Sequence, residues 1–164
     1  FAAGILQNAA GAMVFTSPTV NGYKRYKPNS LAPDRVVWGR DNKGAMLRIV
    51  GAGPGDSATR IENRVGEPAA NPYLYIASQI LSGLDGLNKG LVPPEITDDP
   101  YATDAERLPT NLMDAVTALD ESTMFRQALG NRFVDYFLHI KRAEIARFLS
   151  TVTDWEQREY FELF

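Results

Sequence analysis

The sequence predicts an α+β fold in a single domain, with a few antiparallel strands followed by a helical half. Short runs rich in β-branched and aromatic residues occur between residues 36 and 64, whereas apolar residues recur at helical spacing from residue 71 onward. The length of 164 residues allows one domain with its own core but not two ordinary domains. A hydrophobic share of 45% and a charged share of 23% indicate an ordered globular protein.

The first elements are expected to be a helix, a loop and a small sheet. Residues 2–13 are mostly small, which indicates the end of a helix packed closely against another element, and Pro18 follows as a breaker. A loop is expected over residues 26–34, because it contains Pro28, Asn29, Ser30 and Pro33.

Three strands are expected next. Residues 36–39 and 45–50 are rich in strand-forming residues, and the turn at residues 41–44 between them predicts a hairpin. Residues 51–56 form a glycine-rich loop that leads into a third strand at residues 60–64.

The remaining chain is expected to be helical apart from a long surface excursion at residues 90–110. Asn71 caps the first of these helices and Pro72 occupies its first turn. Gly130 stops one of the later helices, and Thr153 with Glu156 forms a capping box for the last one. The expected helices are 71–87, 112–119, 122–129, 131–151 and a final one that begins after residue 153.

Charge is segregated along the chain, although the net charge is only −3. A basic segment inside an acidic protein indicates a local anion site rather than a nucleic-acid surface, which usually requires a broadly basic domain. We therefore expect no nucleic-acid partner. Between residues 24 and 64 the basic residues are Lys24, Arg25, Lys27, Arg35, Arg40, Lys43, Arg48, Arg60 and Arg64, and the acidic ones are Asp34, Asp41, Asp56 and Glu62.

The composition also bears on the compartment. The chain has no cysteine, which excludes disulfides and thiolate metal sites and fits a reducing compartment. No apolar run approaches the ~18 residues that a membrane-spanning helix needs, and the first residues do not form a signal peptide. We expect a cytoplasmic protein without membrane contact. Phe1 lies within an expected helix, so we also expect the chain to be part of a longer protein.

The strand at residues 60–64 has an unusual polar face. Side chains alternate along a strand, so Arg60, Glu62 and Arg64 are expected on one face, with a carboxylate between two guanidinium groups. This arrangement is typical of a site where a carboxylate binds a metal ion and arginines bind anionic oxygens. A solvated strand face with surface salt bridges remains an equal alternative from these residues alone.

Other candidate sites are weaker. His139 is the single histidine, and no serine has a nucleophile-elbow context, so we expect a structural role for it. The glycine-rich residues 51–55 lack the Lys-Ser/Thr ending of a phosphate loop and precede a strand, which favours a permissive turn. Asp98, Asp99, Asp104 and Glu106 lack EF-hand spacing and are expected in a solvated loop.

Three segments in register are far more specific. They are Asn21-Gly22-Tyr23-Lys24-Arg25 with Ala32-Pro33, then residues 38–49 (WGRDNKGAMLRI), then Arg60-Ile61-Glu62-Asn63-Arg64 with residues 69–74 (AANPYL). In this order and spacing the chain resembles the C-terminal part of the catalytic domain of glutamine synthetase, most strongly over residues 1–90. The contexts of Trp38 and Arg64 are similar to the gamma-glutamyl-polyamine ligase branch.

The resemblance implies roles for individual residues. Arg25 and Arg64 match the family's catalytic and glutamate-binding arginines, the second also near the transferred phosphate. Glu62 matches a metal-binding carboxylate for Mg²⁺ or Mn²⁺. The residues that match the ATP-binding positions are Lys43, Arg48 and Arg60, and Lys43 keeps the charge of an arginine but loses its bidentate geometry.

One departure from the glutamine synthetase pattern concerns the position that binds the amine substrate. Glutamine synthetases carry a glutamate before the Ala-Pro pair, where it helps to bind and deprotonate ammonium, and this chain has Leu31. The loss of the anion disfavours ammonium, whereas an apolar side chain tolerates an alkyl amine.

The resemblance therefore implies that residues 1–164 are one C-terminal fragment of such a catalytic domain, without the N-terminal β-grasp domain and the first part of the catalytic domain. It implies that the full-length parent is an ATP-dependent ligase that joins glutamate to ammonia or a primary amine through γ-glutamyl phosphate, and that the fragment alone is inactive. The parent is expected to be a ring-type homo-oligomer (a dodecamer). The alternative is a catalytically inactive structural or regulatory subunit.

Overall fold

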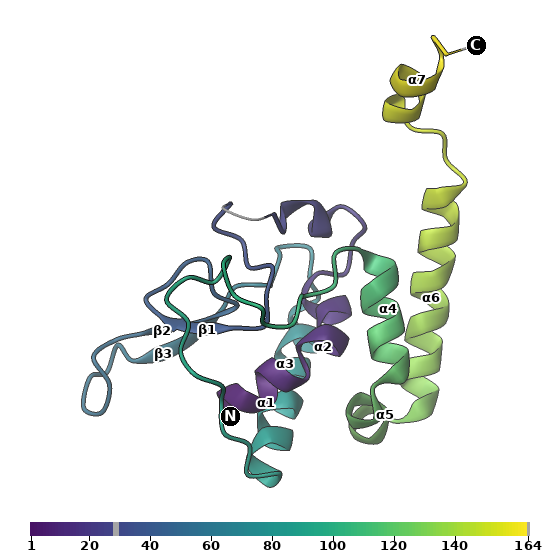
Figure 1. The fold of residues 1–164 in the computed structure, drawn as a ribbon. Helices are drawn as coiled ribbons and strands as arrows, with labels where there is room; N and C mark the ends of the chain where they lie inside the picture. The colour runs from purple at the N-terminus through teal and green to yellow at the C-terminus, as the bar shows by residue number, and fades with distance from the viewer. Residues whose placement is uncertain (28–29, 164) are drawn as a thin grey trace.

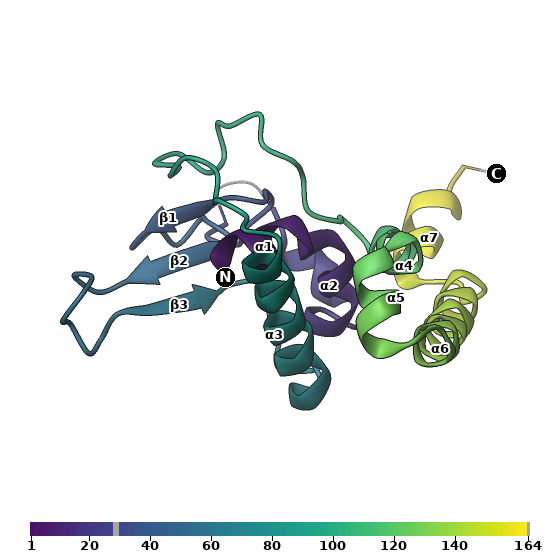
Figure 2. The ribbon, with the colours of Figure 1, turned by 90° about the horizontal axis from the view of Figure 1, so that it is seen from below.

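A small sheet and a helical half lie on opposite sides of a central group of three helices (Figures 1 and 2). The computed structural model describes residues 1–27 and 30–163; Pro28 and Asn29 of the expected loop lie outside the described residues. The central helices are α1, α2 and α3, and the helical half consists of α4, α5 and α6. The elements are α1 (Ala2–Gln7), α2 (Ala9–Thr16), η1 (Gly22–Arg25), β1 (Trp38–Arg40), β2 (Leu47–Val50), β3 (Arg60–Asn63), α3 (Pro72–Asn88), α4 (Leu112–Glu121), α5 (Thr123–Leu129), α6 (Asn131–Leu149) and α7 (Asp154–Tyr160).

The sheet confirms the α+β class but corrects the expected hairpin. β2 and β3 pair antiparallel, whereas β1 and β2 pair parallel, with Trp38 opposite Leu47. The connection between β1 and β2 curls back because Asp41 adopts a left-handed backbone conformation (φ 48°) and the Asn42 side chain accepts a hydrogen bond from Gly44 N at 2.9 Å. The turn residues were therefore recognised correctly, but the direction of the following strand was not.

The segment after α3 covers the outer edge of β1. Thr97 N donates to Trp38 O at 3.1 Å, and the Trp38 indole donates to Pro94 O at 2.7 Å. An isolated antiparallel bridge joins Arg35 to Arg107 further along. The expected excursion at residues 90–110 is thus irregular but fixed to the sheet, which protects an otherwise open strand edge.

Close packing of small residues joins α1 to α3, as the N-terminal sequence predicted. A Cβ atom placed on Gly4 would lie 2.1 Å from Ser82 O, and one on Gly86 would lie 2.5 Å from Gly4 Cα. The expected single helix is divided at Asn8 into α1 and α2, and α2 continues to Thr16. Only glycine allows the two backbones to approach so closely.

The helical half packs against α2 through aromatic side chains. The ring centroid of Phe15 lies 5.6 Å from that of Phe125 in an edge-to-face arrangement and 5.1 Å from that of Phe137. Phe125 is fully buried, and Val134 and Leu138 of α6 complete this part of the core. These contacts fix α4, α5 and α6 to the central helices.

Local capping signals agree with the sequence. Asn71 accepts hydrogen bonds from Tyr73 N and Leu74 N at the start of α3, Gly130 has φ 83° between α5 and α6, and the capping box before α7 is present.

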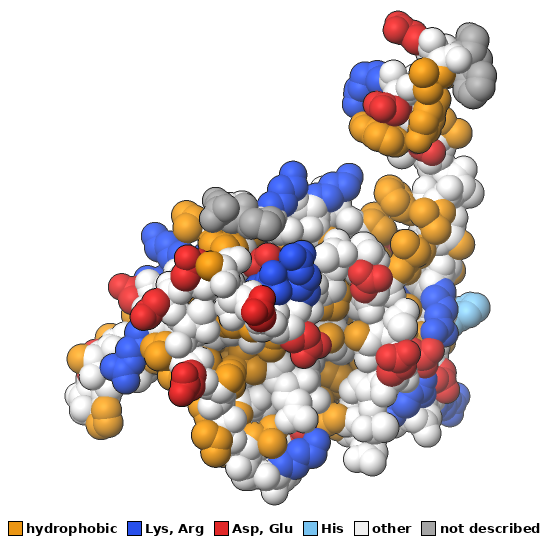
Figure 3. Space-filling view, viewed as in Figure 1, with side chains coloured by type: hydrophobic (Ala, Val, Ile, Leu, Met, Phe, Trp, Pro, Cys, Tyr) orange, Lys and Arg blue, Asp and Glu red, His pale blue; other side chains and the backbone are white. Residues whose placement is uncertain are grey.

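α7 stands apart from the body of the molecule (Figure 1), and apolar side chains are exposed on it and on the end of α6 (Figure 3). No helix in the described part of the chain is long and apolar enough to cross a membrane.

Candidate active site

Glu62 is the centre of a charged cluster at the sheet. The antiparallel register places Arg48 of β2 opposite Glu62 of β3. Glu62 Oε2 accepts a hydrogen bond from Arg48 Nη1 at 3.2 Å, and Oε1 accepts one from Arg64 Nη1. The side chains of Arg48 and Arg64 are only 19% and 20% exposed, so the two ion pairs are partly shielded from water.

The two arginines beside Glu62 differ from the predicted pair. Arg64 was predicted correctly, but the second guanidinium belongs to Arg48 on the neighbouring strand. Arg60 instead donates from Nη1 to Ala58 O at 2.9 Å and is exposed. Arg60 is the first residue of β3 and pairs with Val50, and its hydrogen bond to Ala58 places its side chain along the preceding loop.

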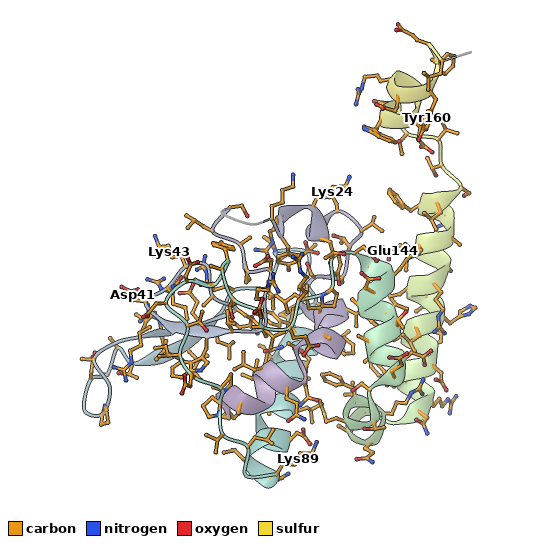
Figure 4. All side chains as sticks on the ribbon, in the orientation of Figure 1. Lys24, Asp41, Lys43, Lys89, Glu144 and Tyr160 are labelled. Atoms are coloured by element: carbon orange, nitrogen blue, oxygen red, sulfur yellow. The ribbon has the colours of Figure 1, made fainter. Side chains whose placement is uncertain are left out.

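Asp41 extends the cluster and was not predicted from the sequence. Arg48 donates to Asp41 Oδ1 from Nε at 2.9 Å and also from Nη2, so its guanidinium joins Asp41 to Glu62. Figure 4 shows Asp41 and Lys43 close to each other in the β1–β2 connection. The position of Asp41, directly after a strand and before Asn-Lys-Gly, could have predicted a turn residue here, because aspartate tolerates the left-handed backbone conformation.

The arginines stabilise both carboxylates in the charged form. A hydrogen bond from Arg64, together with the charges of Arg64 and Arg48, holds the pKa of Glu62 below its ordinary value. Hydrogen bonds from Arg48 likewise lower the pKa of Asp41. Both carboxylates therefore stay ionised at neutral pH.

Arg64 also holds two neighbouring loops through their backbone. Its Nε donates to Lys43 O at 2.8 Å, and its Nη2 donates to Leu31 O at 3.1 Å. One planar guanidinium thus contacts β3, the β1–β2 connection and the segment that contains Leu31. Leu31 has φ 58° and is 59% exposed, so its side chain faces solvent beside Arg64.

Arg25 reaches the same place from η1. Its Nη2 donates to Val65 O and to Gly66 O, each at 2.8 Å, and its Nη1 donates to Arg64 O at 3.4 Å. The guanidinium carbon lies 4.7 Å from the centre of the Tyr26 ring. Arg25 is therefore held on the backbone that immediately follows β3.

The predicted residues fall into three groups. Arg25, Arg48, Glu62 and Arg64 form one connected cluster. Lys43 joins it through its backbone carbonyl, and its side chain is exposed. Arg60 lies at the margin, on the loop side of β3.

A divalent metal ion does not fit the described residues by themselves. Within residues 1–27 and 30–163, no three His, Cys, Asp or Glu side chains come together in a group that could hold one. Both oxygens of Glu62 already accept hydrogen bonds from arginines. Any metal ion at Glu62 would need further ligands from outside the described residues.

The weaker candidates lie outside the cluster. His139 is exposed on α6 (Figure 3), so it contributes neither to the cluster nor to the buried core. Gly51, Gly53 and Gly55 all have positive φ, which confirms a permissive turn. The side chains of the four acidic residues at 98, 99, 104 and 106 are exposed, as expected for a solvated loop.

Comparison with known proteins identifies relatives of the chain. Residues 1–160 match the family described as glutamine synthetase, catalytic domain. The chain belongs to the glutamine synthetase family. It is 49% identical over 175 residues to gamma-glutamylanilide synthase from Acinetobacter sp, with 99% of this chain and 35% of that protein covered. It is 35% identical to glutamine synthetase from Methanococcus maripaludis, with 99% of this chain and 38% of that protein covered.

Solved structures of the family agree with the fold. A structure described as a GmaS/ADP complex superimposes with a TM-score of 0.84 at 33% identity, covering 98% of this chain and 38% of that one. Apo GmaS without ligand gives a TM-score of 0.83 at 36% identity. The chain thus spans somewhat more than a third of the length of the relatives that it matches.

Proposed function

We propose that the chain is the C-terminal part of the catalytic domain of a longer glutamate–amine ligase, called the parent enzyme below. The observation that carries the proposal is the pairing of Glu62 with Arg48 and Arg64, with Arg25 held on the adjoining backbone, in a glutamine synthetase-family chain that is 49% identical to a gamma-glutamylanilide synthase. Family membership supports the class of reaction, and the cluster supports a site for anionic oxygens.

The proposed reaction has two steps. A γ-carboxylate oxygen of glutamate attacks the γ-phosphorus of ATP, and the bond to the ADP oxygen breaks. The amine nitrogen then attacks the γ-carbonyl carbon of γ-glutamyl phosphate, phosphate leaves with the electrons of the C–O bond, and the nitrogen loses a proton. Both steps concentrate negative charge on phosphate and carboxylate oxygens, which preorganised cations stabilise.

The arginines have donors left for this task. A guanidinium carries five N–H donors, and Arg64 uses three of them on Glu62, Lys43 and Leu31. We assign the remaining two to the glutamate carboxylate and the transferred phosphoryl group. We assign Arg25 to glutamate, and the nucleotide phosphates to Lys43, Arg48 and Arg60.

The cofactor assignment is also a proposal. We propose ATP as phosphoryl donor and Mg²⁺ or Mn²⁺ as the metal, with Glu62 as one ligand among others supplied by the rest of the parent enzyme. To bind a metal ion, Glu62 would have to release or share its hydrogen bonds with Arg48 and Arg64.

We propose a primary amine rather than ammonia as the preferred acceptor. Leu31 stands where an anion would be needed to bind and deprotonate ammonium, and its side chain is apolar and exposed. Relatives named for anilide and ethanolamide products share 49% and 37% identity with this chain, which supports the same choice. Ammonia is the second candidate, because glutamine synthetases are also among the relatives.

We further propose that the parent enzyme is a cytoplasmic ring-type homo-oligomer. Trp155 and Tyr160 of α7 form an edge-to-face pair and are 56% and 49% exposed, so a second copy of the chain could cover them. Sedimentation of the parent enzyme as a monomer at micromolar concentration would contradict this assembly.

The decisive experiment measures amide formation by the parent enzyme with ATP, glutamate and a panel of aniline, ethanolamine, alkylamines and ammonia. Mass spectrometry of the amide and parallel measurement of released phosphate should show one amide per phosphate. The isolated 164-residue chain serves as a control and should be inactive. A parent enzyme that forms no amide with any acceptor would indicate the inactive-subunit alternative.

A further inference from the structure

Two consecutive carbonyl groups at Leu31 and Ala32 are held by side chains from distant parts of the chain. Arg64 Nη2 donates to Leu31 O at 3.1 Å, and the Tyr101 hydroxyl donates to Ala32 O at 3.1 Å. Arg64 follows β3, whereas Tyr101 belongs to the irregular segment between α3 and α4. The backbone that carries Leu31 is therefore fixed from both sides.

The backbone needs this support because its conformation is unfavourable. Leu31 has φ 58°, in the left-handed region that residues with a Cβ atom rarely adopt. Such a conformation persists only where neighbouring contacts determine it. Ala32 is 7% exposed and Pro33 is buried, while Leu31 is 59% exposed. The anchored backbone thus presents one apolar side chain to solvent.

Tyr101 also contacts the β1–β2 connection. A Cβ atom on Gly44 would lie 3.0 Å from Tyr101 Cε2 and 3.2 Å from its hydroxyl oxygen, so the ring lies directly against this glycine. The adjacent Lys43 carbonyl accepts a hydrogen bond from Arg64 Nε at 2.8 Å. Tyr101 and Arg64 therefore both join the Leu31–Ala32 segment to residues 43–44.

We propose that Tyr101 is a positioning residue for acceptor selection, acting through Leu31. This inference rests on the proposed amide-forming function of the parent enzyme and adds a residue outside the charged cluster to it. The Tyr101 hydroxyl holds the Ala32 carbonyl, the carbonyl fixes the backbone of Leu31, and Leu31 then lines the path of the amine. Without that hydroxyl, Leu31 samples other conformations and discriminates less between amines and ammonia.

The test compares Tyr101→Phe with the wild-type parent enzyme. The substitution keeps the ring against Gly44 and removes one hydrogen bond. The ratio of kcat/KM for the best amine to that for ammonia should fall about threefold to tenfold, which corresponds to the loss of one hydrogen bond. The KM values for glutamate and ATP should stay unchanged, and the melting temperature should fall by only a few degrees, as expected for the loss of one hydrogen bond. Tyr136→Phe is the matched control, because Tyr136 is 66% exposed on α6.

A second background tests whether Tyr101 acts through Leu31. In a Leu31→Ala enzyme, Tyr101→Phe should cause no further change in the selectivity ratio, because the side chain that it positions is gone. Amide hydrogen exchange at residues 30–32 gives a measurement independent of turnover. It should become faster in Tyr101→Phe and remain unchanged in Tyr136→Phe.

Each unfavourable result has a distinct meaning. An active wild-type enzyme with the same selectivity or the same exchange in Tyr101→Phe would overturn the positioning role and leave the proposed function intact. A selectivity change that persists in the Leu31→Ala background would show that Tyr101 does not act through Leu31. A wild-type enzyme that forms no amide would refute the proposed function and this inference together.

Discussion

Replacement of Leu31 by glutamate should shift the parent enzyme towards ammonia. Arg64 holds the Leu31 carbonyl at 3.1 Å, so a new side chain would project from the same fixed backbone. A carboxylate there would attract ammonium and accept its proton, while it would disfavour the apolar part of a larger amine.

The structure limits the size of the effect. Exposed charge pairs contribute about 0.2–1 kcal/mol, and shielded charge-assisted hydrogen bonds about 1.5–3 kcal/mol. Residue 31 is 59% exposed before substrate binds, so we take a value at the upper end of the range for exposed pairs, about 1 kcal/mol. This corresponds to a shift of roughly fivefold in the ratio of kcat/KM for ammonia to that for the amine. The new carboxylate also has Arg64 nearby, so the KM for glutamate should rise in parallel.

A competition assay measures this shift directly. The enzyme is supplied with ammonium and aniline at equal concentration, and mass spectrometry gives the ratio of the two amides. Leu31→Gln is the control for size without charge, and Val92→Glu, at an 85% exposed position, is the control for added charge elsewhere. An unchanged ratio in Leu31→Glu, or an equal shift in Leu31→Gln, would refute the reasoning. Efficient use of ammonia and rejection of every amine by the wild-type enzyme would refute it as well.

Three further predictions concern the site and the core of the parent enzyme. Glu62→Gln should abolish turnover while the parent enzyme still folds, because the substitution removes the charge but keeps the shape; the melting temperature should fall slightly, because the ion pairs with Arg48 and Arg64 are lost. Glu95→Gln should remain active, and near-normal turnover in Glu62→Gln would show that Glu62 is only an ion-pair partner. Phe125→Ala should lower the free energy of unfolding by about 3–5 kcal/mol, because Phe125 is fully buried. Tyr136→Ala is the exposed control and should lower it by less than about 0.5 kcal/mol. Urea denaturation measures both values, and similar losses in the two variants would contradict the packing argument. Hydrogen bonds from Arg142 and Arg126 lower the pKa of Asp120 in the folded state. The contribution of Asp120 to the free energy of unfolding is therefore present above its unfolded pKa of about 3.9 and is lost as pH falls through the folded value. The free energy of unfolding should fall less steeply with decreasing pH in Asp120→Asn than in the wild type, and an identical pH dependence would exclude this linkage.

Local signals in the sequence predicted much of the helical half. Asn71 before Pro72, Gly130 at positive φ and the Thr153–Glu156 capping box act within a few residues of their position. Their effect depends on the backbone nearby and not on the rest of the fold, so they can be recognised in one sequence. Periodicity located the helices for the same reason, to within a few residues at their ends.

The direction of β2 depends on longer-range contacts. Both a hairpin and the observed parallel pair require a turn at residues 41–44, and the sequence shows only that turn. Thr97 and Pro94 hydrogen-bond to Trp38 from the other side of β1, so the edge of the sheet is occupied by a segment more than fifty residues away. The dependence on long-range contacts also explains why Arg60, rather than Arg48, was expected beside Glu62. Arg48 lies opposite Glu62 because of the register between β2 and β3, which the alternation of side chains within one strand cannot reveal.

The geometry of the charged cluster depends on backbone carbonyls, which no sequence pattern marks. Arg64 contacts the carbonyls of Lys43 and Leu31, and Arg25 contacts those of Val65 and Gly66. Each guanidinium holds several acceptors and still has N–H groups for the substrate oxygens that we propose it binds. A lysine carries the same charge on a single nitrogen and cannot span these acceptors while it also binds an anion. The positions therefore require arginine for its shape as well as its charge, because the side chains that would bind the substrate also hold together the loops around it.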